Sequence, residues 1–239
     1  MRAPLRAVTV LALTSAMTFI WGAGSTSAMD IIRFGDQLVM SGDVVGDECD
    51  RLRTALDAHP DITTVVLRNS HGGNADSGYC VGELLRARGV NTAVSGHCNS
   101  SCSRMFLGGV QRQFTDDEPA TQTWIAFHSN YDKAGLIKPG APERLQAWIA
   151  KYSDGKADER LVEIWTHIEN HQGFVYFFDS KRVPEGRATL SCTGYERGPN
   201  RLDQCTAYPH EDAYGNGIAT SSELVHSNDR HGVAAAERY

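Results

Sequence analysis

Two strands rich in β-branched residues flank a helical pattern, and this order constrains the fold more than any other feature of the sequence. Residues 61–70, DITTVVLRNS, have the composition of a buried strand, and so do residues 90–95, VNTAVS. Between them, residues 71–89 open with two glycines and continue with apolar residues at helical spacing. A strand, a helix and a second strand in this order predict an α/β fold with largely parallel pairing.

The strand and helix patterns continue on both sides of this unit. Residues 30–39 read as a strand pair, and residues 42–59 carry apolar residues at helical spacing. Downstream, residues 100–107 predict a short helix and residues 123–129 predict another strand. Residues 132–170 differ, because they hold two amphipathic helical patterns that break at an Asp-Gly pair. We therefore expect a core of repeated strand–helix units with a helical arm packed on the main sheet.

The first 28 residues have the features of a secretory signal peptide. Arg2 and Arg6 form a charged start, and the apolar stretch 8–20 is too short to span a membrane comfortably. Small residues end at Ala28, where we expect cleavage. This predicts a periplasmic or secreted protein with one mature domain at 29–239. The alternative is an uncleaved anchor, and in either case this segment is the only contact with a membrane that we expect.

The charge of the chain restricts its partners. The formal net charge is −6, and the sequence has no run of basic residues. Nucleic-acid-binding proteins present basic patches, so nucleic acid is not an expected partner. The sequence has no ATP-binding or cofactor-binding motif, and we therefore expect no cofactor.

The cysteines indicate an oxidised protein. An even number of them in an exported chain favours disulfides over free thiols, although the sequence leaves the pairing open. All lie after the signal segment, at Cys49, Cys80, Cys98, Cys102, Cys192 and Cys205. The last two bound a loop at 190–207 that is rich in Gly, Pro and Asn. A local disulfide there would stabilise the fold by about 3 kcal/mol.

Three polar features follow the three best-defined strands. The glycines in NSHGGN, residues 69–74, would let backbone amides approach an anion closely, as in an oxyanion hole. Ser100 stands at a predicted helix start, where unpaired amides and the helix dipole favour a nucleophilic oxygen. His128 ends the third strand and would serve as a general base. Singly, these features also fit a turn, a helix cap and a structural histidine, so the order of all three carries the catalytic interpretation.

The three motifs in this order resemble the proteolytic subunit of Clp protease and the wider crotonase-like superfamily. That subunit has, in outline, a strand and Asn-Ser-Pro-Gly-Gly, a helix, a strand and Gly-x-Ala-Ala-Ser, then a strand ending in Met-Ile-His. Exported bacterial relatives with Gly-x-Cys-Ala-Ser-Ala-Cys around the serine and Gly-Phe-His at the histidine are closer still. The resemblance covers about residues 60–130. It implies a serine peptidase with a crotonase-like or Clp-like fold that forms a homo-oligomer, such as a trimer or a ring.

The resemblance assigns roles residue by residue. Ser100 matches the nucleophile and His128 matches the general base. The backbone amide of Gly72 or Gly73, together with that of Ser101, matches the oxyanion hole. The resemblance therefore implies acyl transfer through a serine that is activated by a histidine.

The third member of the implied triad is less well anchored by sequence. The family's acid follows a pair of helices, where Asp179 in YFFDSKR is the best match. Asp203 and Asp212 are the alternatives. The chain also departs from the family at His71, which replaces the proline before the two glycines and leaves the geometry of that turn less fixed.

Cys98 and Cys102 flank Ser100 symmetrically. A disulfide between them would clamp the helix start that presents the serine. Either cysteine is also an alternative nucleophile, but an exported thiol next to a second cysteine tends to be oxidised. We therefore interpret both cysteines as structural.

Other motifs fit less well. ADSGY at 75–79 is similar to the serine motif of trypsin-like proteases, but too little chain precedes it to supply the other triad residues. The sequence has no Gly-x-Ser-x-Gly elbow, which argues against the α/β-hydrolase fold. His167 and His171 lie one helical turn apart, but Ile168 stands where a zinc protease needs glutamate. His97 lies beside Cys98 and Cys102, and no third ligand is evident. We expect no metal site there.

The sequence thus supports three hypotheses. The first is an exported serine hydrolase, in particular a peptidase acting on a peptide or protein substrate. The second is a catalytically inactive secreted binding or assembly module with the same fold. The third, a crotonase-like enzyme for acyl thioesters, fits an exported chain poorly because export separates it from coenzyme A.

Overall fold

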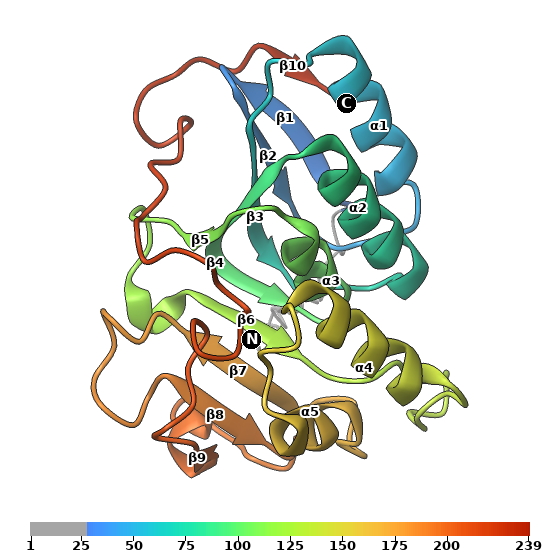
Figure 1. Cartoon of the computed structure of the whole chain (residues 1–239), viewed down its shortest axis with the longest axis vertical. Helices are drawn as coiled ribbons and strands as arrows, with labels where there is room; N and C mark the ends of the chain where they lie inside the picture. The colour runs from blue at the N-terminus through green and yellow to red at the C-terminus, as the bar shows by residue number, and fades with distance from the viewer. Residues whose placement is uncertain (1–27) are drawn as a thin grey trace, which may run out of the picture.

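One mixed sheet runs through residues 28–239, the part of the chain that the computed structural model describes (Figure 1). The order is β10-β1-β2-β3-β4-β6-β7-β8-β9, with β5 beside β4. The strands are β1 (Asp30–Phe34), β2 (Gln37–Ser41), β3 (Thr64–Ser70), β4 (Asn91–Asn99), β5 (Arg112–Phe114), β6 (Trp124–Phe127), β7 (Phe174–Phe178), β8 (Thr189–Cys192), β9 (Thr206–Ala207) and β10 (Glu237–Arg238). The predicted signal segment falls almost wholly outside the described residues.

The centre of the sheet is parallel, as the sequence predicts. β2, β3, β4 and β6 are parallel neighbours, and Val66 of β3 pairs with Val39 on one side and with Ala93 on the other. The outer strands are antiparallel: β1 forms a hairpin with β2, and β7, β8 and β9 extend the sheet beyond β6. The predicted α/β class is confirmed, with the parallel pairing confined to the centre and to β5.

The helices cover one face of this sheet (Figure 1). They are α1 (Glu48–Ala58), α2 (Ala75–Arg88), α3 (Ser101–Gly108), α4 (Ala141–Tyr152) and α5 (Glu159–Thr166), with short 3₁₀ turns at Ala120–Gln122 and Arg201–Gln204. The main core lies between the sheet and these helices, where Leu67, Val94 and Phe106 are fully buried. Within the described residues, none of the helices has the length and apolar character needed to cross a membrane.

The opposite face of the central strands is covered by the C-terminal segment. Val39, Val66 and Ala93 point to this side, and Val225 of the C-terminal segment packs against them. The segment is drawn in red along the edge of Figure 1 away from the helices, and it ends in β10, which pairs with β1. The C-terminal segment therefore acts as a strap over the side of the sheet that lacks helices.

The segment 132–170 forms two helices, as predicted, but they are part of the main core. The chain breaks between α4 and α5 at Asp154 and Gly155, which both have positive φ angles. Trp148 of α4 is nearly buried and Trp165 of α5 is fully buried in the main core. Burial of these two large aromatic side chains stabilises the fold, so the two helices contribute to the main core and are not a separate arm.

The predicted helix at 42–59 begins later than expected, at Glu48. Residues 42–47 form a loop in which Gly42 and Gly46 have φ angles of 108° and 130°. Val44 in this loop bridges to Gly73, so its apolar side chain reflects contact with the turn after β3 and not helical spacing. The correction matters for function, because this loop supports the turn that carries the predicted oxyanion hole.

All six cysteines are paired in disulfides. Cys192–Cys205 closes the predicted loop, and Cys98–Cys102 joins the residues on either side of Ser100. The third bond joins Cys49 of α1 to Cys80 of α2. Three disulfides fit an oxidising compartment outside the cytoplasm.

Candidate active site

The carboxyl ends of three parallel strands bring the predicted motifs together. β3 leads into Gly72 and Gly73, β4 into Ser100, and β6 into His128. Ligands of parallel α/β sheets bind at this edge of the strands. The hydroxyl oxygen of Ser100 lies 2.8 Å from Nε2 of His128, which is a hydrogen-bonding distance for a nucleophile and its base.

Ser100 lies in a sharp turn between β4 and α3. Its φ and ψ angles are 55° and −118°, a conformation that costs a non-glycine residue about 1–3 kcal/mol. α/β-Hydrolases present their nucleophile on a similarly strained strand-to-helix turn, with glycines two residues before and after the serine. Here Cys98 and Cys102 hold those two positions, with Cα atoms 5.2 Å apart. The turn at Ser100 thus has the backbone form of a nucleophile elbow without the Gly-x-Ser-x-Gly motif by which a sequence predicts one.

Two backbone amides next to Ser100 are available to an oxyanion. Within residues 28–239, the amides of Gly73 and Ser101 donate no hydrogen bond. Gly73 lines the same cavity as Ser100, and Ser101 begins α3, where helix amides are unpaired. The amide of Gly72 instead donates to the hydroxyl of Ser70 at 3.2 Å. Of the two predicted glycines, Gly73 is therefore the one with a free donor.

Gly72 has a steric role. Its φ angle is 90°, and a Cβ added there would lie 2.7 Å from Cβ of Ser100. The turn is held by Asp43, whose carboxylate accepts the amide of His71 at 3.1 Å. Asp43 thus supplies the restraint that the missing proline would otherwise provide. The ring of His71 lies against that of His97, with centroids 4.6 Å apart.

His128 is held by aromatic side chains. Its ring stacks on Phe174 with centroids 4.0 Å apart, and Tyr131 lies on the ring at 5.0 Å. Burial lowers the pKa of His128 to about 3, and the positive charge of Arg104 acts in the same direction, while the backbone of Gly173 opposes it. The imidazole is therefore neutral at pH 7, and Nε2 is able to accept a proton.

Arg104 is an unusual feature behind the site. It lies on α3 one helical turn after Ser100 and is 1% exposed. It donates to the backbone oxygen of His128 at 3.1 Å and to the side-chain oxygen of Asn130 at 2.7 Å. No carboxylate pairs with it in the described part of the chain. Its guanidinium thus fixes the backbone of the base, and sequence reasoning missed this role.

Asp179 does not reach His128. In the antiparallel β6–β7 pair, Phe127 faces Val175 and Trp124 faces Phe178. His128 therefore lies at one end of the pair and Asp179 at the other, about 17 Å away at about 3.4 Å per residue. Tyr214 donates to the carboxylate of Asp179 at 2.8 Å. The prediction that Asp179 orients the base is wrong on this geometry.

The two alternative acids have other partners as well. Asp203 pairs with Arg187 at 2.7 Å, and Asp212 accepts from Ser180 at 2.7 Å. Nδ1 of His128 is buried without a well-aligned partner in residues 28–239. Ser100 and His128 therefore form a hydrogen-bonded pair, which we call the dyad, and Phe174 and the backbone of Gly173 contact the ring where a triad would have a carboxylate.

The dyad opens into a cavity of about 640 Å³. Its walls are the turn after β3 and the long loop between β6 and α4. The charged residues of the lining are Asp76, Asp132, Lys133, Lys138 and Arg144. Asp76 is neutralised by Arg144 at 2.5 Å, and Asp132 accepts two backbone amides within its own loop. Asp132 keeps its negative charge, so the lining carries three cations and two carboxylates, and this net positive charge favours an anionic ligand.

The alternative readings of the cysteines and histidines are not supported. Cys98 and Cys102 are bonded to each other, so neither has a thiolate to act as a nucleophile. His167 pairs with Glu163 on α5, while His97 lies against His71 and Trp124. The predicted histidine candidates therefore do not form a metal site.

Comparisons with known proteins find only distant structural similarities. No protein-family model matches the chain, and no curated protein matches it. Among solved structures, a mutant of ClpP1 from Listeria monocytogenes is similar over 82% of this chain and 94% of its own, at 13% identity and a TM-score of 0.49. The 1510-N membrane-bound stomatin-specific protease is similar over 77% of this chain and 75% of its own, at 13% identity and a TM-score of 0.43.

A third solved structure, PA4980 from Pseudomonas aeruginosa, has 10% identity and a TM-score of 0.44 over 82% of this chain and 77% of its own. Similarities this distant do not assign a function to the chain. The residues around Ser100 therefore have to carry the functional assignment.

Proposed function

We propose that this protein is an exported serine hydrolase, and specifically a peptidase. The observation that carries the proposal is the pairing of Ser100 and His128 at 2.8 Å on a strained turn that opens into a cavity. Strain at a non-glycine residue persists when the surrounding structure enforces it, and it is concentrated at functional sites. The disulfides support the exported location.

The proposed reaction is acyl transfer in two steps. The hydroxyl oxygen of Ser100 attacks the scissile carbonyl carbon while its proton passes to Nε2 of His128. The amides of Gly73 and Ser101 stabilise the oxyanion, and the proton then passes to the leaving amine as the C–N bond breaks. Water hydrolyses the acyl-enzyme by the same route, and this returns the proton to Ser100.

Without a carboxylate, the dyad does not stabilise the positive charge that His128 acquires during the reaction. Burial and Arg104 disfavour the imidazolium that forms during attack. Phe174 still fixes the plane of the ring, and Arg104 fixes the backbone of His128, so orientation is kept without an acid. We therefore expect slow turnover compared with a full triad, because the triad acid both orients the base and stabilises its charged form.

The cavity supports a peptide substrate. A volume of about 640 Å³ accommodates several residues of an extended peptide. Lys133 and Lys138 favour acidic side chains or a terminal carboxylate. The sequence resemblance to the Clp subunit supports a peptidase and also a homo-oligomer. An acyl thioester of coenzyme A is disfavoured by export.

The second candidate is an inactive binding module with the same fold. The observation that favours it is that no carboxylate within residues 28–239 faces His128, while burial and the cation of Arg104 disfavour the charged imidazole. In this case the cavity would hold a peptide without cleaving it.

Hydrolysis of three substrate classes separates these functions. The oxidised mature chain is incubated with a library of acidic peptides, an activated ester and an acyl thioester. We expect peptide and ester cleavage that is lost in Ser100→Ala and His128→Ala and retained in Ser222→Ala, which alters an exposed serine. Binding of the peptides by folded wild-type protein without cleavage of any class would favour the inactive module.

A further inference from the structure

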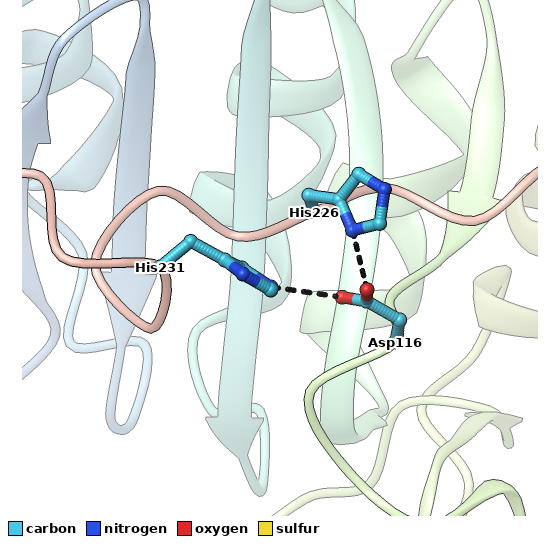
Figure 2. Close-up of side chains that lie close together, drawn as sticks. All are labelled: Asp116, His226 and His231. Carbon is cyan, nitrogen blue, oxygen red and sulfur yellow. Dashed lines mark hydrogen bonds and ion pairs between the residues drawn. The ribbon is translucent and has the colours of Figure 1, made fainter.

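A second cluster of reactive side chains lies away from the dyad, where the C-terminal strap crosses the end of β5. Asp116 follows β5, while His226 and His231 lie on the strap. Figure 2 shows both imidazoles directed at the carboxylate of Asp116 from two sides. None of the three contributes to the cavity that contains Ser100.

The ligand atoms converge as a metal site requires. Nδ1 of His226 contacts one oxygen of Asp116, and Nε2 of His231 lies 3.5 Å from the other. All three ligand atoms lie within 4.8 Å of one another. Metal bonds of about 2.0–2.1 Å in a tetrahedral site place the ligand atoms about 3.3 Å apart. Side-chain shifts of about 1 Å would therefore bring these three atoms to the spacing of a tetrahedral site. The exposed histidines are free to make such shifts, because their side chains are 73% and 51% accessible.

The backbone holds the two segments in register. Thr115 bridges to Val225 in parallel, and the amide of Asp116 donates to the backbone oxygen of Val225 at 3.3 Å. His226 is therefore fixed next to Asp116 by main-chain pairing and not by the side chains alone. One oxygen of Asp116 is buried with no hydrogen bond except the long contact to His231. This leaves an acceptor aimed into the cluster.

The nearby Arg68 binds other carboxylates and does not pair with Asp116. Asp117 and Asp229 are both engaged by Arg68 in a buried network. Within the described residues, Asp116 makes ion pairs only with His226 and His231, and neither an arginine nor a lysine occupies its carboxylate.

We propose that Asp116, His226 and His231 bind a divalent transition metal of the zinc class. Two imidazoles and one carboxylate suit Zn²⁺, whereas Mg²⁺ and Ca²⁺ prefer all-oxygen ligands. Because the ligands come from segments separated by 110 residues of sequence, the metal joins the strap to the sheet. A clip that closes so long a loop stabilises the covering of the central strands.

Metal titration of the oxidised mature chain, without a histidine tag, tests the proposal. Protein stripped with a chelator is titrated with Co²⁺, whose visible absorption reports tetrahedral ligands, and with Zn²⁺ by calorimetry. We expect one equivalent of each metal to bind, and at least about tenfold weaker binding in His226→Ala, in His231→Ala and in Asp116→Asn. His167→Ala is the matched control, because it removes an exposed histidine that pairs with Glu163 elsewhere.

A second measurement is independent of ligand identity. Hydrogen exchange of the amides at 225–231 should slow when Zn²⁺ is added to wild type and should not change in the His226→Ala and His231→Ala double variant. Equal Zn²⁺ binding by wild type and double variant, or no binding by folded wild type, would overturn the proposal. Either result leaves the Ser100 proposal untouched, since the two sites share no residue.

Discussion

The disulfide between Cys98 and Cys102 should control the reactivity of Ser100. The two cysteines stand immediately outside the strained turn, and both are fully buried. The double variant Cys98→Ala and Cys102→Ala removes the bond and keeps small apolar side chains in its place. We expect the variant to fold and to react more slowly through Ser100.

The magnitude follows from two competing energies. The backbone conformation of Ser100 costs about 1–3 kcal/mol. Residues four apart in sequence close a very short loop, and loop entropy gives such a bond about 2 kcal/mol. The bond and the strain are thus of similar size. Without the bond the turn is free to release its strain, and about 2 kcal/mol of strain released lowers the population of the reactive conformer about 30-fold.

The assay is the second-order rate constant for a fluorophosphonate, measured at 25 °C for wild type and variant. The variant Cys49→Ala and Cys80→Ala is the matched control, because it removes a disulfide between α1 and α2 whose cysteines do not line the cavity. We expect a 10-fold to 30-fold lower rate constant for the first variant and an unchanged rate constant for the control. Equal rate constants for wild type and the Cys98 variant would refute the role of the bond.

Three further predictions concern the base and the cavity. The pKa of His128 is lowered by burial to about 3 from about 6.5 in the unfolded chain, so the unfolded state binds this proton first. The free energy of unfolding, measured by chemical denaturation at each pH, should therefore fall as the pH drops from about 6.5 towards 3. In His128→Ala the free energy of unfolding should fall less steeply over the same pH range. Phe174→Leu should lower kcat about tenfold with little change in KM, because the imidazole loses its stacking partner; an unchanged kcat would contradict this. Lys133→Gln with Lys138→Gln should lower kcat/KM for acidic peptides several-fold at low salt, and the difference should vanish at high salt.

Much of the fold and the nucleophile–base pair could be predicted from the sequence, because both depend on local patterns. The β-branched run at 64–70 and the helical spacing at 75–88 are properties of neighbouring residues. Parallel pairing then brings the strand ends together, so Ser100 and His128 meet although 28 residues separate them.

The sequence could not show that Asp179 lies far from His128, because that distance depends on the direction of β7 relative to β6. The sequence places Asp179 after the strand that follows the two helices, as the family resemblance requires. The antiparallel direction of β7 then carries Asp179 to the far end of the pair and brings Phe174 to His128. No spacing rule in the sequence distinguishes the two ends of a strand whose direction is unknown.

The turn at Ser100 and the Asp116 cluster could not be predicted from the sequence, for two different reasons. The elbow motif is defined by two glycines, whereas here two disulfide-bonded cysteines hold the flanking positions. The ligands of the cluster lie 110 residues apart, and metal motifs recognisable in sequence require short spacing. Arg104 carries one usable sequence signal, since it is the only charged residue of the α3 segment and precedes the apolar run at 105–107.

The central claim is that Ser100 is a nucleophile activated by His128. Mass spectrometry of the oxidised mature chain after reaction with a fluorophosphonate tests it most directly. We expect one adduct per chain, located on the peptide at Ser100, which is absent in Ser100→Ala and strongly reduced in His128→Ala. A folded protein that takes up no adduct, or an adduct that persists in Ser100→Ala, would contradict the claim.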